Sequence, residues 1–67
     1  MVNHQEKLKL THAVHVDKQG WFEVKSYNEM WNTWIVYNQD GTQKKIWSWT
    51  VDKIRYSIHD EEVEEEL

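Results

Sequence analysis

The sequence contains no cysteine and no proline, and only two glycines among its 67 residues. Without cysteine, neither a disulfide framework nor a thiolate zinc site can stabilise so short a chain, so stability must come from packing or association. Both glycines, Gly20 and Gly41, stand at the ends of turn sequences, which leaves none for a glycine-rich phosphate loop. Without proline, only charge discourages pairing at sheet edges, and we therefore expect that a homodimer can form through strand edges.

Long apolar segments are also missing. No run approaches the roughly 18 residues of a membrane span, and the N-terminal sequence MVNHQEKLKL lacks the apolar region of a signal peptide. We therefore expect a cytoplasmic protein that has no membrane contact. The length allows one domain, whose small core depends on five tryptophans, three tyrosines and one phenylalanine.

The segment from Trp31 to Val51 holds four of the five tryptophans and predicts a β-hairpin. Asn38-Gln39-Asp40-Gly41 is typical of a type I turn followed by a glycine with positive φ. If Asn38 faces Thr42, the opposed pairs are Tyr37 with Gln43, Ile35 with Lys45, Thr33 with Trp47, and Trp31 with Trp49. This register defines the face that we expect to form the core: Trp31, Thr33, Ile35, Tyr37, Trp47, Trp49 and Val51.

The opposite face of this hairpin is not cleanly polar. Trp34 lies opposite Ile46, with Val36 beside them and Lys44 on the same face. A small domain needs most of its apolar residues inside, so another part of the chain can fold over this patch. The alternative is that the patch is a partner surface with a polar rim.

The segment from Lys7 to Val16 alternates between apolar and polar residues, which predicts a half-buried strand. Asp17-Lys18-Gln19-Gly20 repeats the turn pattern of the later hairpin. The same register rule pairs Val16 with Phe22, Val14 with Val24, and His12 with Ser26. Trp21 and Tyr27 then point outward from the second strand.

Residues 52–59 alternate as a fifth strand would, and their β-branched residues favour that interpretation. The alternative is a helix capped by Asp52. We therefore predict an all-β fold, a five-stranded antiparallel meander that forms a strongly bent sheet or small barrel over residues 6–59. Residues 1–5 are expected to be frayed. The predicted core consists of Leu10, Val14, Val16, Phe22, Val24, Trp31, Ile35, Trp47 and Trp49.

The net charge of −4 is unevenly distributed. Residues 60–67 carry six of the twelve acidic residues and no base, so the remaining chain, with eight bases and six acids, has a charge of +2. We predict that 60–67 is a disordered acidic tail. It either serves only as a solubilising segment or shields a weakly basic surface around Lys44, Lys53 and Arg55 from polyanions.

The sequence offers little for catalysis or metal binding. His12 and His15 point to opposite faces of the predicted strand, and the other two histidines lie near the termini. The serines lack a nucleophile motif, and so small a domain has little room for a pocket that excludes water. We expect neither an enzyme nor a bound cofactor or metal.

These observations favour a small protein-interaction module or inhibitor that uses an exposed aromatic patch or a sheet edge. The alternative is binding of single-stranded nucleic acid, with bases stacking on outward aromatic rings and lysines following the phosphates. Both alternatives draw on one candidate binding surface: Trp34, Val36, Ile46, Lys44, Trp21, Tyr27, Lys25 and Arg55.

Overall fold

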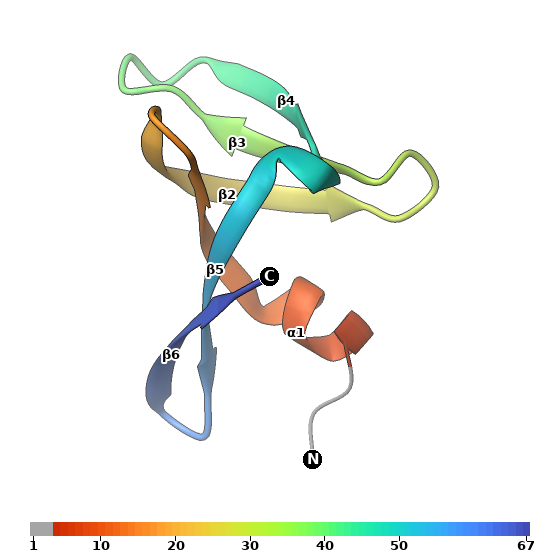
Figure 1. Ribbon diagram of the computed structural model, residues 1–67, viewed down its shortest axis with the longest axis vertical. Coiled ribbons are helices and arrows are strands. Elements are labelled where there is room, and N and C mark those ends of the chain that lie inside the picture. The colour runs from red at the N-terminus through yellow and green to blue at the C-terminus, as the bar shows by residue number, and fades with distance from the viewer. Residues whose placement is uncertain (1–3) are drawn as a thin grey trace.

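The computed structural model describes residues 4–67, which form one sheet of six antiparallel strands and a short N-terminal helix (Figure 1). The elements in chain order are α1 (His4–Leu10), β1 (Thr11–Val16), β2 (Gly20–Asn28), β3 (Thr33–Tyr37), β4 (Gln43–Trp47), the 3-10 helix η1 (Ser48–Thr50), β5 (Val51–Ile58) and β6 (Glu61–Glu66). The order across the sheet is β4-β3-β2-β1-β5-β6, so β4 and β6 are its two edges. The predicted all-β class is confirmed, and of the two predicted shapes the structure has the bent sheet rather than the small barrel. The prediction of a five-stranded meander is wrong, because there are six strands and β5 pairs with β1.

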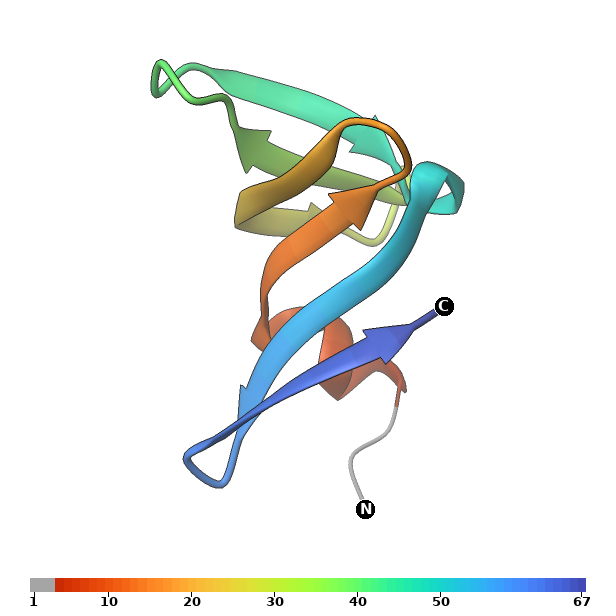
Figure 2. The ribbon, with the colours of Figure 1, turned by 60° about the vertical axis from the view of Figure 1, so that its left-hand side comes forward.

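The sheet is strongly bent. Figures 1 and 2 show that β2, β3 and β4 run across one end of the molecule, while β5 and β6 run away from them toward the other end. The pairing is irregular between Val24 and Ser26 of β2, and at two places between β1 and β5. Bulges of this kind bend strands and increase their twist, which accounts for the curvature.

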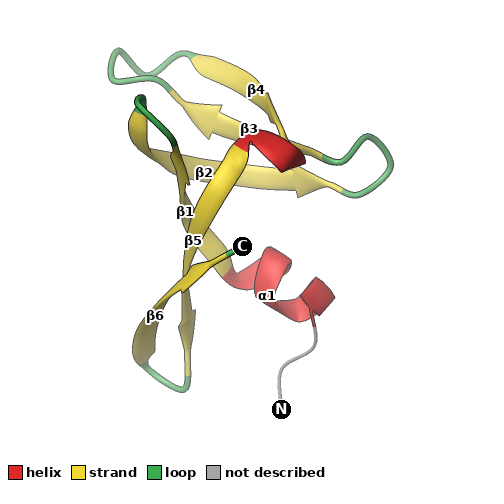
Figure 3. Ribbon diagram, viewed as in Figure 1, coloured by secondary structure: helices red, strands yellow, loops and turns green. Residues whose placement is uncertain are grey.

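The hairpin of β3 and β4 has the predicted register. Thr33 lies opposite Trp47, and Tyr37 lies opposite Gln43. At the turn, the Asn38 amide donates to the Thr42 carbonyl oxygen at 2.7 Å, and Gly41 has a φ of 87°. The predicted pair of Trp31 with Trp49 does not form, because β4 ends and the chain enters η1 (Figure 3).

The core lies on the face of this hairpin opposite to the predicted one. Trp34 is 1% exposed and Val36 is completely buried, whereas Trp31, Trp47 and Trp49 are 63%, 49% and 70% exposed. The chain itself covers the Trp34 face, since β1 and β5 supply five of the eight residues of the buried apolar cluster. That cluster consists of Val14, Val16, Trp34, Val36, Ile46, Val51, Ile54 and Tyr56.

The first hairpin differs from its predicted register by two residues. Val16 lies opposite Gly20, and Val14 lies opposite Phe22 rather than Val24. The turn begins one residue early, because the Gln19 amide donates to the Val16 carbonyl oxygen at 3.0 Å. A shift of two residues preserves the faces of the strands, so Phe22 and Val24 still pack against the core.

The end of β2 departs from the predicted alternation. The bulge around Lys25 reverses the direction of the side chains that follow it. Tyr27, predicted to point outward, therefore turns toward the core, where the centre of its ring lies 4.5 Å from the centre of the Trp34 ring.

The N-terminal part of the predicted first strand is helical. Residues 4–10 form α1, and Thr11 Oγ1 donates to the Lys7 carbonyl oxygen at 2.6 Å where the helix ends. Leu8 packs against the core, while Leu10, predicted to be buried, is 44% exposed. Of the segment 1–5 that was predicted to be frayed, residues 4 and 5 belong to α1, and residues 1–3 lie outside the described residues.

The acidic tail is a strand rather than a disordered segment. Residues 52–59 lie mostly in β5, as favoured over the helix, and a two-residue turn at His59 and Asp60 connects β5 to β6. Both turn residues have positive φ, 50° and 63°, which suits a tight hairpin. Val63 lies opposite Tyr56 and packs against the core. The reasoning from charge missed these tertiary contacts, which hold the tail in place.

Candidate functional site

Three of the exposed large apolar side chains are grouped beside the hairpin of β3 and β4. We call this region the tryptophan patch and define it as Trp31, Ile35, Trp47 and Trp49. Ile35 is half-buried, and the three tryptophans are exposed. Ile35 and Trp47 share the outer face of the hairpin, opposite to the face that carries Trp34.

Backbone geometry fixes the stacked pair in this patch. The Ser48 amide donates to the Asn32 carbonyl oxygen at 2.8 Å, which extends the hairpin beyond Trp47. The chain then turns through η1, where Thr50 Oγ1 donates to the Trp47 carbonyl oxygen at 2.7 Å. The rings of Trp47 and Trp49 consequently stack, with centroids 4.8 Å apart and planes 11° from parallel.

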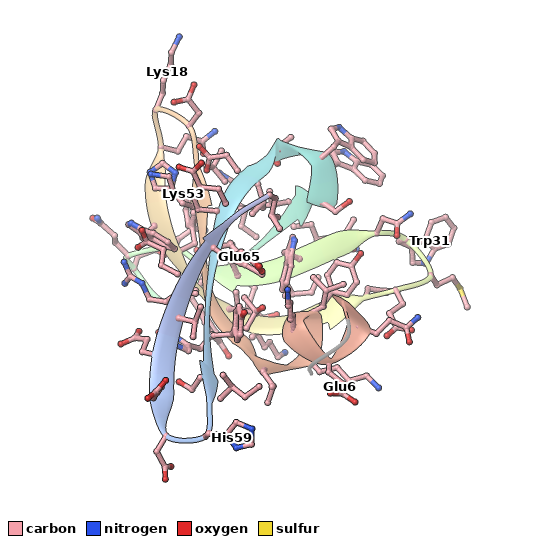
Figure 4. The ribbon with its side chains drawn as sticks, turned by 60° about the horizontal axis from the view of Figure 1, so that its bottom comes forward. Glu6, Lys18, Trp31, Lys53, His59 and Glu65 are labelled. Carbon is pink, nitrogen blue, oxygen red and sulfur yellow. The ribbon has the colours of Figure 1, made fainter. Side chains whose placement is uncertain are left out.

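The loop between β2 and β3 presents Trp31. The Asn28 carboxamide oxygen accepts hydrogen bonds from the backbone amides of Met30 and Trp31, at 3.0 and 3.3 Å. Asn32 has a positive φ of 52°, and its side chain accepts a hydrogen bond from the Tyr27 hydroxyl at 3.3 Å. Figure 4 shows Trp31 at the tip of this loop, away from the body of the molecule.

Trp31 and Trp47 line a hollow of about 340 Å³. Its other lining residues are Asn28, Thr33, Ile35 and Lys45. Two indole walls with a few polar groups are typical of a surface that holds an apolar side chain in a defined orientation.

A larger, shallower groove of about 750 Å³ lies between α1 and the second half of β2. It shares Asn28 and Ile35 with the hollow, so the two depressions are neighbours. The groove is lined by Leu8, Lys9, Thr11, Val24, Lys25, Ser26, Tyr27, Asn28, Glu29, Met30 and Ile35.

The structure separates the predicted candidate surface into buried and exposed parts. Trp34, Val36 and Ile46 belong to the core and present no surface to a partner. Lys44 donates to the Gln19 side chain at 3.1 Å, and its ammonium lies 5.1 Å from the centre of the Phe22 ring. These four residues therefore do not form a joint docking surface.

Two of the predicted candidates, Trp21 and Arg55, lie together on the outer face of β2 and β5. The Arg55 guanidinium is 4.0 Å from the centre of the Trp21 ring, and its Nη2 donates to Glu64 at 2.9 Å. The other two candidates, Lys25 and Tyr27, line the groove beside α1. The structure thus divides the exposed candidates between two regions.

His15 and Asp52 form a polar contact beside Trp21. Their Nδ1 and Oδ1 atoms are 2.7 Å apart, and the hydrogen bond from His15 lowers the pKa of the Asp52 carboxyl from its ordinary value of 3.8. The ring centres of His15 and Trp21 are 5.2 Å apart, in an edge-to-face arrangement. Within residues 4–67, no three His, Asp or Glu side chains are grouped so that they could hold a metal ion.

The glutamates of β6 contact basic side chains on three other elements, α1, β1 and β5. Lys7 Nζ donates to Glu65 at 3.0 Å, and this hydrogen bond raises the pKa of Lys7 above 10.5. His12 lies 3.3 Å from Glu62. Glu65 projects from β6 toward the body of the molecule (Figure 4). The acidic segment therefore reaches the body at Lys7 and Arg55, with no ion pair to Lys44 among the described residues.

Sequence reasoning missed the tryptophan patch by placing Trp31, Trp47 and Trp49 inside. One signal could have identified its exposure. Gln43 and Lys45 share a face with Trp47 in the predicted register. Two successive polar side chains on one face of a strand are typical of a face that points to solvent.

No helix within residues 4–67 is long and apolar enough to cross a membrane. The chain matches no protein-family model, and no curated protein or solved structure is significantly similar to it.

Proposed function

We propose that this protein is a non-enzymatic protein-interaction module whose docking surface is the tryptophan patch. The observation that carries this proposal is the exposure of three tryptophans in one small region. Burying a tryptophan removes about 200 Å² from water, which is worth roughly 5 kcal/mol at about 25 cal/mol/Å². A partner that covers three largely exposed indoles can therefore gain several kcal/mol, and tryptophan is enriched among the residues that dominate interfaces.

The geometry of the patch also supports docking. The Trp31 amide donates to the Asn28 side chain and the Ser48 amide donates to the Asn32 carbonyl oxygen. These hydrogen bonds hold the backbone around Trp31 and Trp47, so little conformational entropy is lost when a partner binds. Lys45 and the Asn28 side chain provide a polar rim. An apolar centre with a polar rim is the usual anatomy of a protein interface.

Single-stranded nucleic acid remains the second candidate, and the position of Lys45 favours it. This lysine lines the same hollow as Trp31 and Trp47, an arrangement that can place a phosphate beside a stacked base. Two observations make it the weaker candidate. The chain has a net charge of −4, and Trp47 and Trp49 already stack on each other.

Selection from a display library of random protein fragments can test the proposal. Binders selected on the wild type should lose most of their affinity for a Trp31→Ala/Trp49→Ala double variant, because both indoles lie in the proposed interface. A Trp21→Ala variant serves as the matched control outside the patch and should bind as the wild type does. Fragments that bind the double variant with unchanged affinity would contradict the proposal.

The nucleic-acid candidate requires a separate titration with mixed-sequence single-stranded oligonucleotides. If bases stack on the patch, tryptophan fluorescence should fall, and the affinity should decrease steeply as salt is added. The proposed protein-docking function predicts no quenching. Salt-dependent quenching that is absent in the double variant would replace the proposed function with the second candidate.

Self-association is a further proposal about partners, and it concerns the open edges of the sheet. The β6 edge consists almost entirely of glutamates, which repel a second copy, so β4 is the edge suited to a homodimer. Sedimentation at high micromolar concentration should then show a dimer that Lys45→Glu weakens. A purely monomeric species would exclude this assembly.

A further inference from the structure

We propose that the groove between α1 and the second half of β2 receives an extended acidic segment of the partner protein. This segment adds to β2 as a strand and places an apolar side chain in the hollow between Trp31 and Trp47. The inference rests on the proposed function, since it states what kind of chain the docking surface recognises.

The first argument is the incomplete pairing of β2. β1 pairs with Gly20–Glu23 only, whereas β3 pairs with residues as far as Asn28. Within the described residues, the stretch Val24–Asn28 therefore has a strand neighbour on one side alone. Figure 1 shows why this side of β2 has no strand neighbour: the end of β1 that follows α1 diverges from β2. An unpaired side of a strand offers peptide groups that an incoming strand can bind.

The second argument is the shape of the surface beside this open side. The groove of about 750 Å³ follows residues 24–28 and has Leu8 of α1 as its opposite wall. Five strand residues span about 17 Å at about 3.4 Å each, which matches a short extended peptide. Because the groove and the hollow are neighbours that share Asn28 and Ile35, one segment can reach both.

The third argument is charge. Three lysines line the combined surface, Lys9, Lys25 and Lys45, against one acidic residue, Glu29. This local excess of positive charge opposes the net charge of the whole chain, which is −4. Complementary charges steer a partner and select against wrong ones, so the surface favours a segment that bears carboxylates.

An extended peptide fits these features better than a nucleic acid does. A strand supplies both donors and acceptors along its backbone, as the open side of β2 requires, whereas a phosphate backbone supplies only acceptors. The alternation of side chains along an added strand also allows carboxylates to face the lysines while apolar groups contact Leu8 and Val24.

Selection from a displayed library of random twelve-residue peptides on the full chain can test this inference. The enriched peptides should combine several acidic residues with at least one large apolar residue. Lys25→Glu should weaken their binding at least about fivefold, because it reverses a charge in the groove. Lys18→Glu is the matched control, since it changes the net charge equally in the exposed turn between β1 and β2. It should change the affinity less than about twofold.

The decisive readout is amide hydrogen exchange with a selected peptide bound. Strand addition should slow exchange at amides within residues 24–28 that point to the open side of β2. Peptides that depend on Trp31 but leave these amides unchanged and tolerate Lys25→Glu would overturn the inference while retaining the proposed function. Oligonucleotide binding that protects none of these amides would also overturn it. The absence of any enriched peptide would count against both proposals.

Discussion

The two ends of the sheet expose opposite kinds of surface. At the β4 end, Trp31, Trp47 and Trp49 lie in solvent beside a well-packed hairpin. At the β6 end, five glutamates surround one apolar residue, Val63, which packs inward. A segment with so little apolar area is held by its contacts with the body, whereas the tryptophans lie largely outside the core. The comparison teaches that aromatic content alone does not locate the core, and that a run of like charges can still form structure.

The largest expected loss of stability is at Trp34, the buried tryptophan of the hairpin of β3 and β4. Trp34→Ala removes the largest fully buried side chain, and such substitutions typically cost about 3–5 kcal/mol. That loss approaches the entire stability of a small domain, so the variant should be largely unfolded at 25 °C. Circular dichroism and urea denaturation would show this. A cooperative transition at the wild-type midpoint would mean that Trp34 is not in the core.

A smaller effect is expected at the other end of the sheet, from removal of residues 60–67. The truncation uncovers Tyr56 and deletes the packing of Val63, which is worth about 1–2 kcal/mol for a partly buried valine. Urea denaturation followed by tryptophan fluorescence should show a lower midpoint. Val63→Ser should reproduce much of the loss, whereas Glu61→Gln should have little effect. An unchanged midpoint in the truncated chain would restore the interpretation of 60–67 as a disordered tail.

The two ends also differ in how much could be predicted from the sequence. The turn from Asn38 to Gly41 has a strong local signature, and it correctly determined the register of β3 and β4. The buried face could not be decided locally, because both faces of this hairpin carry large apolar side chains. Packing of β1 and β5 onto Trp34 made that decision, and this contact joins residues far apart in the chain.

The remaining errors have similar causes. The bulge at Lys25, which turns Tyr27 inward, has no glycine to mark it. Composition predicts disorder for 60–67, whereas the packing of Val63 against the core and the ion pairs of the glutamates with Lys7 and Arg55 hold this segment as a strand. Candidate residues inferred from one hairpin in isolation were therefore unreliable, although their strand pairing was correct.

A loss of stability at low pH is expected from Asp52, at the start of β5, and it should be smaller than the effect of removing residues 60–67. The pKa of Asp52 is lower in the folded chain than its ordinary value of 3.8, chiefly because His15 hydrogen-bonds to the carboxylate. A carboxyl with a depressed pKa contributes stability above its unfolded pKa, and this contribution is lost as the pH falls through about 3.8 and below. Urea midpoints measured between about pH 2 and pH 6 should therefore fall less steeply for Asp52→Asn than for the wild type.

Asp40 provides the control for this acid effect, because its pKa is also lowered, by hydrogen bonds from Thr42 in the turn between β3 and β4. Asp40→Asn should remove its own part of the pH dependence and leave the part due to Asp52 intact. If Asp52→Asn has the same pH dependence as the wild type, the contact with His15 does not stabilise the folded chain.

The smallest expected effect is that of Trp31→Ala, and it sharpens the contrast with Trp34→Ala. The indole of Trp31 is 63% exposed, and the loop that carries it is held by hydrogen bonds from backbone amides to Asn28, which the substitution leaves in place. Substitutions at such exposed sites usually change stability by less than about 0.5 kcal/mol, so the urea midpoint should be almost unchanged. Trp31 is preferred to Trp49 for this comparison, because removing Trp49 would also break its stacking with Trp47. A stable Trp31→Ala variant that has lost partner binding would assign the exposed tryptophan to recognition. A loss of stability comparable to that of Trp34→Ala would instead show that Trp31 belongs to the core, as the sequence had predicted.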